Sequence, residues 1–197
     1  MRKTLLALAA ALLVAPAAPR AQPVSQPAGT GPDVWIAVHL GAAVFQGDEL
    51  RGNVDPGYDV GATVGAWFNR WLGVEGSAAY VQANGTSAGV KRTVWDVPIA
   101  ANLRARWPTK VLEPSIFAGA ALHLASLEVG PAGGGGPSSS RSTTAFGFQV
   151  GAALDFHVTR TMLVGAAVER SFVPASFGGA SVRLDALRIA LALTHQF

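Results

Sequence analysis

The strongest constraint in this 197-residue chain is a two-residue alternation of apolar with polar or small side chains, which begins near residue 34 and continues to the C-terminus. Successive side chains of a β-strand point to opposite faces, so this alternation predicts strands that each have one apolar face. An amphipathic helix would instead repeat apolar residues every three or four positions, and the 23 glycines also disfavour helices. We therefore expect an all-β fold.

Eight segments carry the alternation, and their lengths are close to the roughly 9–11 residues that a tilted strand needs to cross a bilayer. We expect strands at residues 34–45, 57–68, 71–81, 94–105, 115–127, 145–156, 162–170 and 186–197. Long polar or glycine-rich connections (46–56, 82–93, 128–144, 171–181) alternate with shorter ones (69–70, 106–114, 157–160). This order predicts an eight-stranded antiparallel up-and-down transmembrane β-barrel with both termini on the short-turn side.

The N-terminal segment has the three parts of a secretory signal peptide. Positively charged residues 1–3 precede an apolar run at 4–14, and small residues follow at 15–18. At about 11 residues the apolar run is too short for a transmembrane helix, which needs about 20. We expect a signal peptide at 1–21, a linker without periodicity at 22–32, and the barrel domain at 33–197.

The formal net charge of +3 is explained by this leader. Removal of Arg2, Lys3 and Arg20 from the 15 basic residues leaves 12, which equals the 12 acidic residues. A nucleic-acid-binding protein needs clustered basic side chains to neutralise phosphates. The neutral mature chain therefore argues against a nucleic-acid partner.

The low charge content distinguishes a membrane barrel from a soluble one. Only 14% of the residues are charged, compared with about 25% in soluble domains. A soluble lipocalin-like barrel would carry its charges on the large outer surface, whereas here they share strand faces with glycine and alanine, and the opposite faces are apolar. Aromatic residues near the short-turn ends are expected at the membrane interface, namely Trp35, Trp67, Phe68, Trp71, Trp107 and Phe156.

Several segments make the chain similar to a known family. These are Gly-Ala-Thr-Val-Gly-Ala-Trp-Phe at 61–68, Leu-Gly-Val-Glu at 72–75, Asp-Val-Pro-Ile at 96–99, and the terminal Phe197. Together they resemble the small eight-stranded outer-membrane β-barrels of Gram-negative bacteria, the OmpA-like and OmpX-like porin-domain proteins.

The resemblance implies an outer-membrane location with both barrel termini in the periplasm. It also implies contact with outer-membrane lipid and lipopolysaccharide. The barrel-assembly machinery would recognise an alternating C-terminal signal formed by Leu191, Leu193 and Phe197, although His195 stands where an aromatic residue is usual.

The faces opposite the apolar ones should line the lumen. An eight-stranded barrel has an interior just wide enough for side chains to fill it, so buried charges there must pair. We expect a polar network that plugs the lumen, formed by Glu75, Asp96, Asn102, Arg104, Gln149, Asp155, Glu169 and Arg188.

No pattern in the sequence predicts catalysis, a cofactor or a metal site. His123 and Ser126 are three residues apart and point to opposite faces of a regular strand, so they cannot form a nucleophile–base pair there. His39 and His123 without a placed carboxylate are a weak metal signal. The chain has no cysteine and no phosphate-binding or dinucleotide-binding fingerprint. We expect that it is not an enzyme.

Three functional hypotheses remain. The first is a structural or surface-interaction barrel that acts through its extracellular loops, with an unknown extracellular partner. The second is a narrow gated pore for ions or small solutes, and the third is a soluble lipocalin-like ligand-binding barrel. Charged residues are expected on the loops at Asp48, Glu49, Arg51, Lys91, Arg92 and Arg141, where they could contact lipopolysaccharide phosphates.

Overall fold

The computed structural model of the protein describes residues 33–47, 50–133, 136–177 and 180–197. The signal-peptide and linker predictions lie outside these residues. The described strands are β1 (Asp33–Phe45), β2 (Gly57–Trp67), β3 (Leu72–Ser87), β4 (Val90–Arg106), β5 (Leu112–Pro131), β6 (Ser139–His157), β7 (Met162–Phe172), β8 (Pro174–Phe177), β9 (Ala180–Arg183) and β10 (Ala186–Gln196). Within this part of the chain, no helix has the length and hydropathy needed to cross a membrane.

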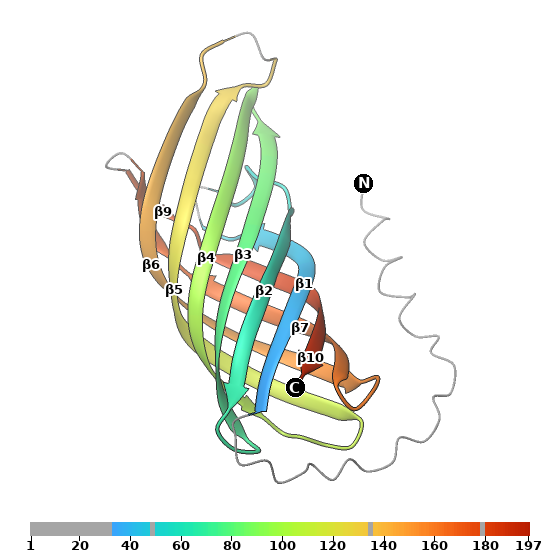
Figure 1. The fold of residues 1–197 in the computed structure, drawn as a ribbon. Coiled ribbons are helices and arrows are strands. Elements are labelled where there is room, and N and C mark those ends of the chain that lie inside the picture. The colour runs from blue at the N-terminus through green and yellow to red at the C-terminus, as the bar shows by residue number, and fades with distance from the viewer. Residues whose placement is uncertain (1–32, 48–49, 134–135, 178–179) are drawn as a thin grey trace.

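Eight of these strands form a closed antiparallel barrel in the order β1-β10-β7-β6-β5-β4-β3-β2 (Figure 1). Strand β1 pairs with β2 on one side and with β10 on the other, where Leu40 lies opposite Leu191. Trp35 lies opposite Gln196, so the start of β1 and the end of β10 meet at the same end of the barrel. The predicted eight-stranded antiparallel barrel is confirmed.

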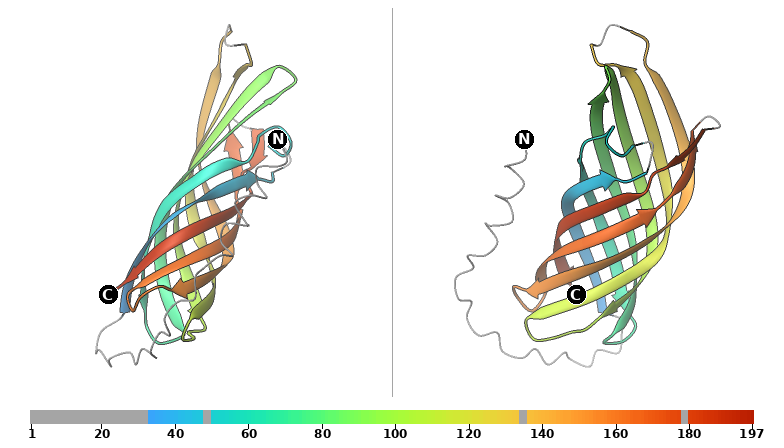
Figure 2. Two further views of the ribbon diagram at one scale, coloured as in Figure 1. Left: turned by 90° about the vertical axis from the view of Figure 1, so that its right-hand side faces the viewer. Right: turned by 180° about the vertical axis from the view of Figure 1, so that it is seen from behind.

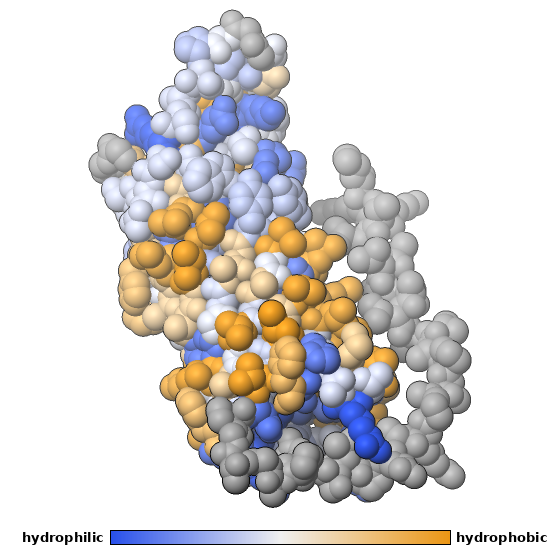
Figure 3. Space-filling view, in the orientation of Figure 1, coloured by the Kyte–Doolittle hydropathy of each residue, from blue (hydrophilic) through white to orange (hydrophobic). Residues whose placement is uncertain are grey.

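The apolar face of every barrel strand points outward, as the alternation predicts. Leu40, Leu103 and Phe148 retain 64%, 69% and 61% of their surface. On the face shown in Figure 3, apolar residues cover the lower and middle part of the barrel, whereas the part toward the long loops is polar. The exposed apolar residues of the other barrel strands continue this cover, which we call the outward apolar band. A soluble barrel would bury these side chains, so the soluble ligand-binding alternative is wrong.

Four neighbouring strands are longer than predicted. Most residues at 82–93 and many at 128–144, expected to be loops, continue the ladders of β3, β4, β5 and β6. The turn between β3 and β4 contains only Ala88 and Gly89, both with positive φ. The small polar residues of 82–93 and 128–144 are typical of loops, but here their backbone N–H and C=O groups are paired with those of neighbouring strands. These strands rise beyond the rest of the barrel as a wall (Figure 2).

The predicted loop at 171–181 also contains regular structure. Strand β7 ends at Phe172, and β8 and β9 then form a separate two-stranded antiparallel sheet. Val173 between β7 and β8 is fully buried. This segment returns into the mouth of the barrel because its alternate residues are apolar, a pattern too short to predict a strand.

The prediction of interfacial aromatic residues is wrong for Trp35 and Trp67. Both side chains point into the barrel, at 3% and 5% exposure, and their rings stack with centroids 6.3 Å apart. They fit because their cross-strand partners are Gly65 and Gly73, where a Cβ would overlap the indole rings. The other four aromatic residues are exposed on the outside, namely Phe68, Trp71, Trp107 and Phe156. For these four, the interfacial position stays a prediction.

Candidate functional site

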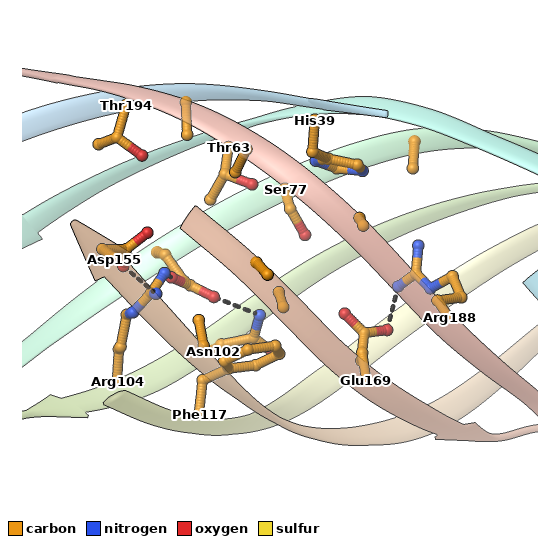
Figure 4. Close-up of a pocket in the computed structure, with 18 of the residues that line it drawn as sticks. His39, Thr63, Ser77, Asn102, Arg104, Phe117, Asp155, Glu169, Arg188 and Thr194 are labelled. Carbon is orange, nitrogen blue, oxygen red and sulfur yellow. Dashed lines mark hydrogen bonds and ion pairs between the residues drawn. The ribbon is translucent and has the colours of Figure 1, made fainter. Parts of the chain in front are cut away.

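The lumen contains two arginine-centred groups of ion pairs. In the first, Arg104 on β4 pairs through Nη1 with Glu75 Oε2 at 2.9 Å and through Nη2 with Asp155 Oδ2 at 3.3 Å. Its Nε and Nη2 atoms also donate to the hydroxyl of Ser115. The three pairing side chains come from β4, β3 and β6, so this group crosses the barrel interior (Figure 4).

The second group lies at the other end of the same cavity (Figure 4). Arg188 on β10 donates to Glu169 on the neighbouring strand β7, its direct register partner. Its Nη1 atom also lies 3.8 Å from Asp59 Oδ1, and the Nε2 atom of His39 lies 3.6 Å from the same oxygen. Asp59 and Arg188 are 1% and 7% exposed, so this cluster is held away from bulk water.

Two amide side chains connect the groups. Asn102 donates to Glu75 at 3.0 Å and accepts from Gln149 at 3.1 Å, and Gln149 in turn accepts from Arg188 at 3.5 Å. The contacts therefore run continuously from Asp155 to Glu169. Seven of the eight residues predicted for the lumen network belong to this chain of contacts.

The eighth predicted residue, Asp96, has a different partner. Its Oδ2 atom lies 2.7 Å from Nδ1 of His123, and both side chains are buried. Among the described residues, the other oxygen of Asp96 and Nε2 of His123 have no hydrogen-bond partner. Asp96 was predicted to face the lumen but not to pair with His123, because alternation gives the face of a residue and not its cross-barrel neighbour.

The short-turn end of the lumen is closed by aromatic and charged side chains. Arg106 lies 3.9 Å above the ring of Trp67 and pairs with Glu113 at 3.2 Å. His157 lies 3.6 Å from the same carboxylate, and Trp35 stacks on Trp67. This floor was not predicted, because residues 106–114 were expected to form a connection, although Arg106 continues the inward alternation of Arg104.

The long-loop end is closed by an apolar plug. The plug residues come from β1, β3–β6, β8–β10 and the segments between strands, and include Phe45, Leu50, Val81, Val94, Val173, Phe177, Val182 and Leu184. Asp185 anchors the β8–β9 hairpin over this cluster. Its carboxylate accepts from the Val173 backbone N–H at 2.9 Å and pairs with Arg183 at 2.8 Å.

Between the floor and the plug lies a cavity of about 80 Å³. Its walls carry the Arg104 and Arg188 groups together with hydroxyls of Thr63, Ser77 and Thr194 (Figure 4). The cavity is large enough for a few water molecules beside these polar groups. The Arg104 and Arg188 groups therefore line one shared space in the lumen.

His123 and Ser126 do not form a nucleophile–base pair in the described residues. His123 is bound to Asp96, whereas the Ser126 hydroxyl contacts the hydroxyl of Ser140. Among the described residues, no group of three or more histidine and carboxylate side chains is arranged to hold a metal ion. The interior chemistry that is observed is ion pairing and hydrogen bonding.

Replacement of Arg188 by Met should destabilise the barrel strongly. The change leaves Glu169 and Asp59 without their guanidinium partner, and breaking a buried ion pair in this way costs about 3–5 kcal/mol. The free energy of unfolding, measured by urea titration in lipid vesicles, should fall by about this amount. Arg160→Met, at an exposed turn, should change it little, and the added change Glu169→Gln should restore part of the loss. Equal stabilities of R188M and R160M would contradict the pairing.

Solved structures of known barrels have the same architecture. OprG from Pseudomonas aeruginosa superposes with a TM-score of 0.62 at 17% identity, covering 84% of this chain and 96% of that chain. Neisserial surface protein A has a TM-score of 0.58 at 14% identity, covering 83% of this chain and 97% of that chain. Ail of Yersinia pestis has a TM-score of 0.55 at 19% identity, covering 84% of this chain and 99% of that chain.

The sequence itself provides the family assignment. No curated protein sequence matches the chain. A family model described as the outer membrane protein beta-barrel domain matches residues 5–191, which is most of its length. Together with the closed barrel and its outward apolar band, this match shows that the chain belongs to the outer membrane β-barrel domain family.

Proposed function

We propose that this outer-membrane barrel has a structural or surface-interaction role and that its lumen is closed to solutes. The observation that carries the proposal is the double closure of the interior, by the Trp67–Arg106 floor at one end and the apolar plug at the other. The polar network between them pairs its charges across the barrel, which rigidifies the interior. The proposal includes no catalysis, in keeping with the separate partners of His123 and Ser126.

The proposed orientation places the short turns and both barrel termini in the periplasm. Barrels of this kind have short periplasmic turns and longer extracellular segments. Here the start of β1 and the end of β10 lie at the short-turn end, and the long wall of β3–β6 rises at the opposite end (Figure 1). In this orientation, the wall and the β8–β9 hairpin form the surface outside the cell.

The wall would bind anionic saccharides, the phosphates of lipopolysaccharide first among them. The wall carries three basic residues, Lys91, Arg92 and Arg141. Among the described residues of the wall, Glu128 is the one acidic residue, so the wall has an excess of positive charge. One guanidinium nitrogen of Arg92 is buried and has no hydrogen-bond partner in the part of the chain that the structure describes. The structural neighbour Ail has been crystallised with the heparin analogue sucrose octasulfate, also a polyanionic saccharide. Arg51 lies in the first loop, whereas Asp48 and Glu49 are outside the described residues.

The C-terminal strand supports recognition by the barrel-assembly machinery. Leu191 and Leu193 face outward, each at 45% exposure, and Phe197 is 75% exposed. The ring of His195 meets the ring of Phe197 edge to face at 4.7 Å. The outer face of β10 thus presents a row of apolar side chains, in which His195 takes the place of the usual aromatic residue.

A narrow gated pore is the second candidate. It is favoured by the cavity in the lumen and by Arg104, which pairs with two carboxylates on different strands and could exchange them. Such a pore would also require movement of the β8–β9 hairpin and of the aromatic floor.

Single-channel recording in planar lipid bilayers distinguishes the two candidates. For the closed barrel, we expect no discrete current steps from the wild-type protein or from Arg104→Ala, because the plug and floor remain in place. A heat-induced shift in gel mobility should first verify that each sample is folded. Wild-type current steps whose size changes in R104A would contradict the closed-lumen proposal and support the pore.

Loss of basic side chains from the wall should weaken binding to soluble, de-acylated lipopolysaccharide. Each basic residue near an anionic surface contributes about 1 kcal/mol, so K91Q combined with R141Q should raise the Kd by about thirtyfold at low salt. The double variant Arg70→Gln and Arg160→Gln has the same charge change at the short-turn end and should bind like the wild type. Equal affinities of the two double variants, measured by calorimetry, would remove the saccharide proposal.

A further inference from the structure

One charged side chain interrupts the apolar outer face of the barrel. Strand β7 presents Met162, Val164, Ala166 and Val168 outward, and the next outward residue is Arg170, which is exposed. Among the described residues of the outward apolar band, Arg170 is the one Asp, Glu, Lys or Arg. Arg170 is the last residue of the strand expected at 162–170, and no role was predicted for it.

The position of Arg170 in the ladders places it near the loop-side rim of the band. It pairs with Val150 on β6 and with Leu187 on β10, and Leu187 pairs in turn with Val44 on β1. Leu187 and Val44 are the last outward apolar residues of their strands toward this rim. One rung above Arg170, Phe172 is the last outward residue of β7 before the chain turns inward at Val173.

Arg170 has no anionic partner among the described residues, whereas Arg104, Arg106, Arg183 and Arg188 each pair with a carboxylate. Its guanidinium lies 5.1 Å from the ring centre of Phe172. Phe172 is the register partner of Phe148, which meets Phe146 edge to face at 5.5 Å. Arg170 therefore has an aromatic partner on the outer face but no carboxylate partner among the described residues.

An arginine on a lipid-facing wall is unfavourable at mid-membrane, and the cost falls near the interface, where the long side chain extends its charge to the headgroups. A guanidinium there binds phosphate through two parallel N–H donors, and its planar group also stacks on aromatic rings. Neutral polar headgroups would not use this charge. An anionic phosphate at the rim satisfies both the charge and the donor geometry.

We propose that Arg170, supported by Phe172, binds the phosphate of a membrane lipid at the outer rim of the barrel. This inference rests on the proposed orientation, which places this rim in the outer leaflet, where the lipid would be the phosphorylated disaccharide lipid of lipopolysaccharide. It differs from the saccharide contacts of the wall because it lies on the lipid-facing surface.

Lipid binding to the full mature chain in phosphatidylcholine nanodiscs tests the proposal. The probe is lipid A that carries its phosphates, with dephosphorylated lipid A as the reference, and bound lipid is counted by native mass spectrometry. Arg170→Gln should weaken binding of the phosphorylated probe about fivefold and leave the reference unchanged. Arg160→Gln, an exposed change of equal charge at the short-turn end, should bind like the wild type, and Arg170→Lys should retain part of the affinity.

Three results would overturn the proposal. They are equal binding of phosphorylated lipid A by the wild type and R170Q, an equal loss in R160Q, and full displacement by inorganic phosphate alone, which would identify a free-ion site. A conductance step in the wild type would contradict the closed-lumen proposal without changing this affinity difference. The two proposals therefore fail separately.

Discussion

The structure depends on the hydrogen-bonded closure between β1 and β10. Hydrocarbon offers no water to backbone N–H and C=O groups, so a spanning sheet must have no open edge. The ladder from Trp35–Gln196 to Phe45–Ala186 removes that edge. Once the sheet is closed, each strand has one face toward lipid and one toward a narrow interior, and the alternation of the sequence follows from this division.

The interior then has to be filled by the same strands that form its wall. Glycines on neighbouring strands leave space for the inward side chains of Trp35 and Trp67. Arg104 and Arg188 each pair with carboxylates from other strands. Among the described residues, three histidines lie beside three different carboxylates, in the pairs His39–Asp59, His123–Asp96 and His157–Glu113. Charges that would be costly alone are thus used to connect strands far apart in the sequence.

The fold could be predicted from the sequence to a large extent, and the site only in part. Alternation located all eight barrel strands because lipid imposes an apolar residue at every second position. Strand ends beyond the apolar band were missed, because residues such as Asn84 and Thr86 lie in a polar environment where strand and loop have similar compositions. Trp35 was predicted at the interface because of its residue type. It follows Val34, which points outward, so the alternation of the strand places Trp35 inside the barrel.

The lumen network shows the same limit. The face of Glu75, Arg104 and Arg188 follows from alternation, whereas the cross-barrel partner of each depends on strand tilt and register. The Asp96–His123 pair and the Arg106–Glu113 pair therefore required the three-dimensional arrangement. The outward position of Arg170 follows from parity alone, and a search for charges on the apolar face would have found it.

The most direct test of the account is to measure what surrounds the outer face in a bilayer. Because the chain has no cysteine, nitroxide labels can be attached to single cysteines at outward positions Leu40 and Ile116 in the band and Thr86 and Ser142 in the wall. Electron paramagnetic resonance should show high oxygen and low nickel-complex accessibility at the first two positions and the reverse at the other two. High nickel accessibility at Leu40 and Ile116 would contradict a lipid-facing apolar band.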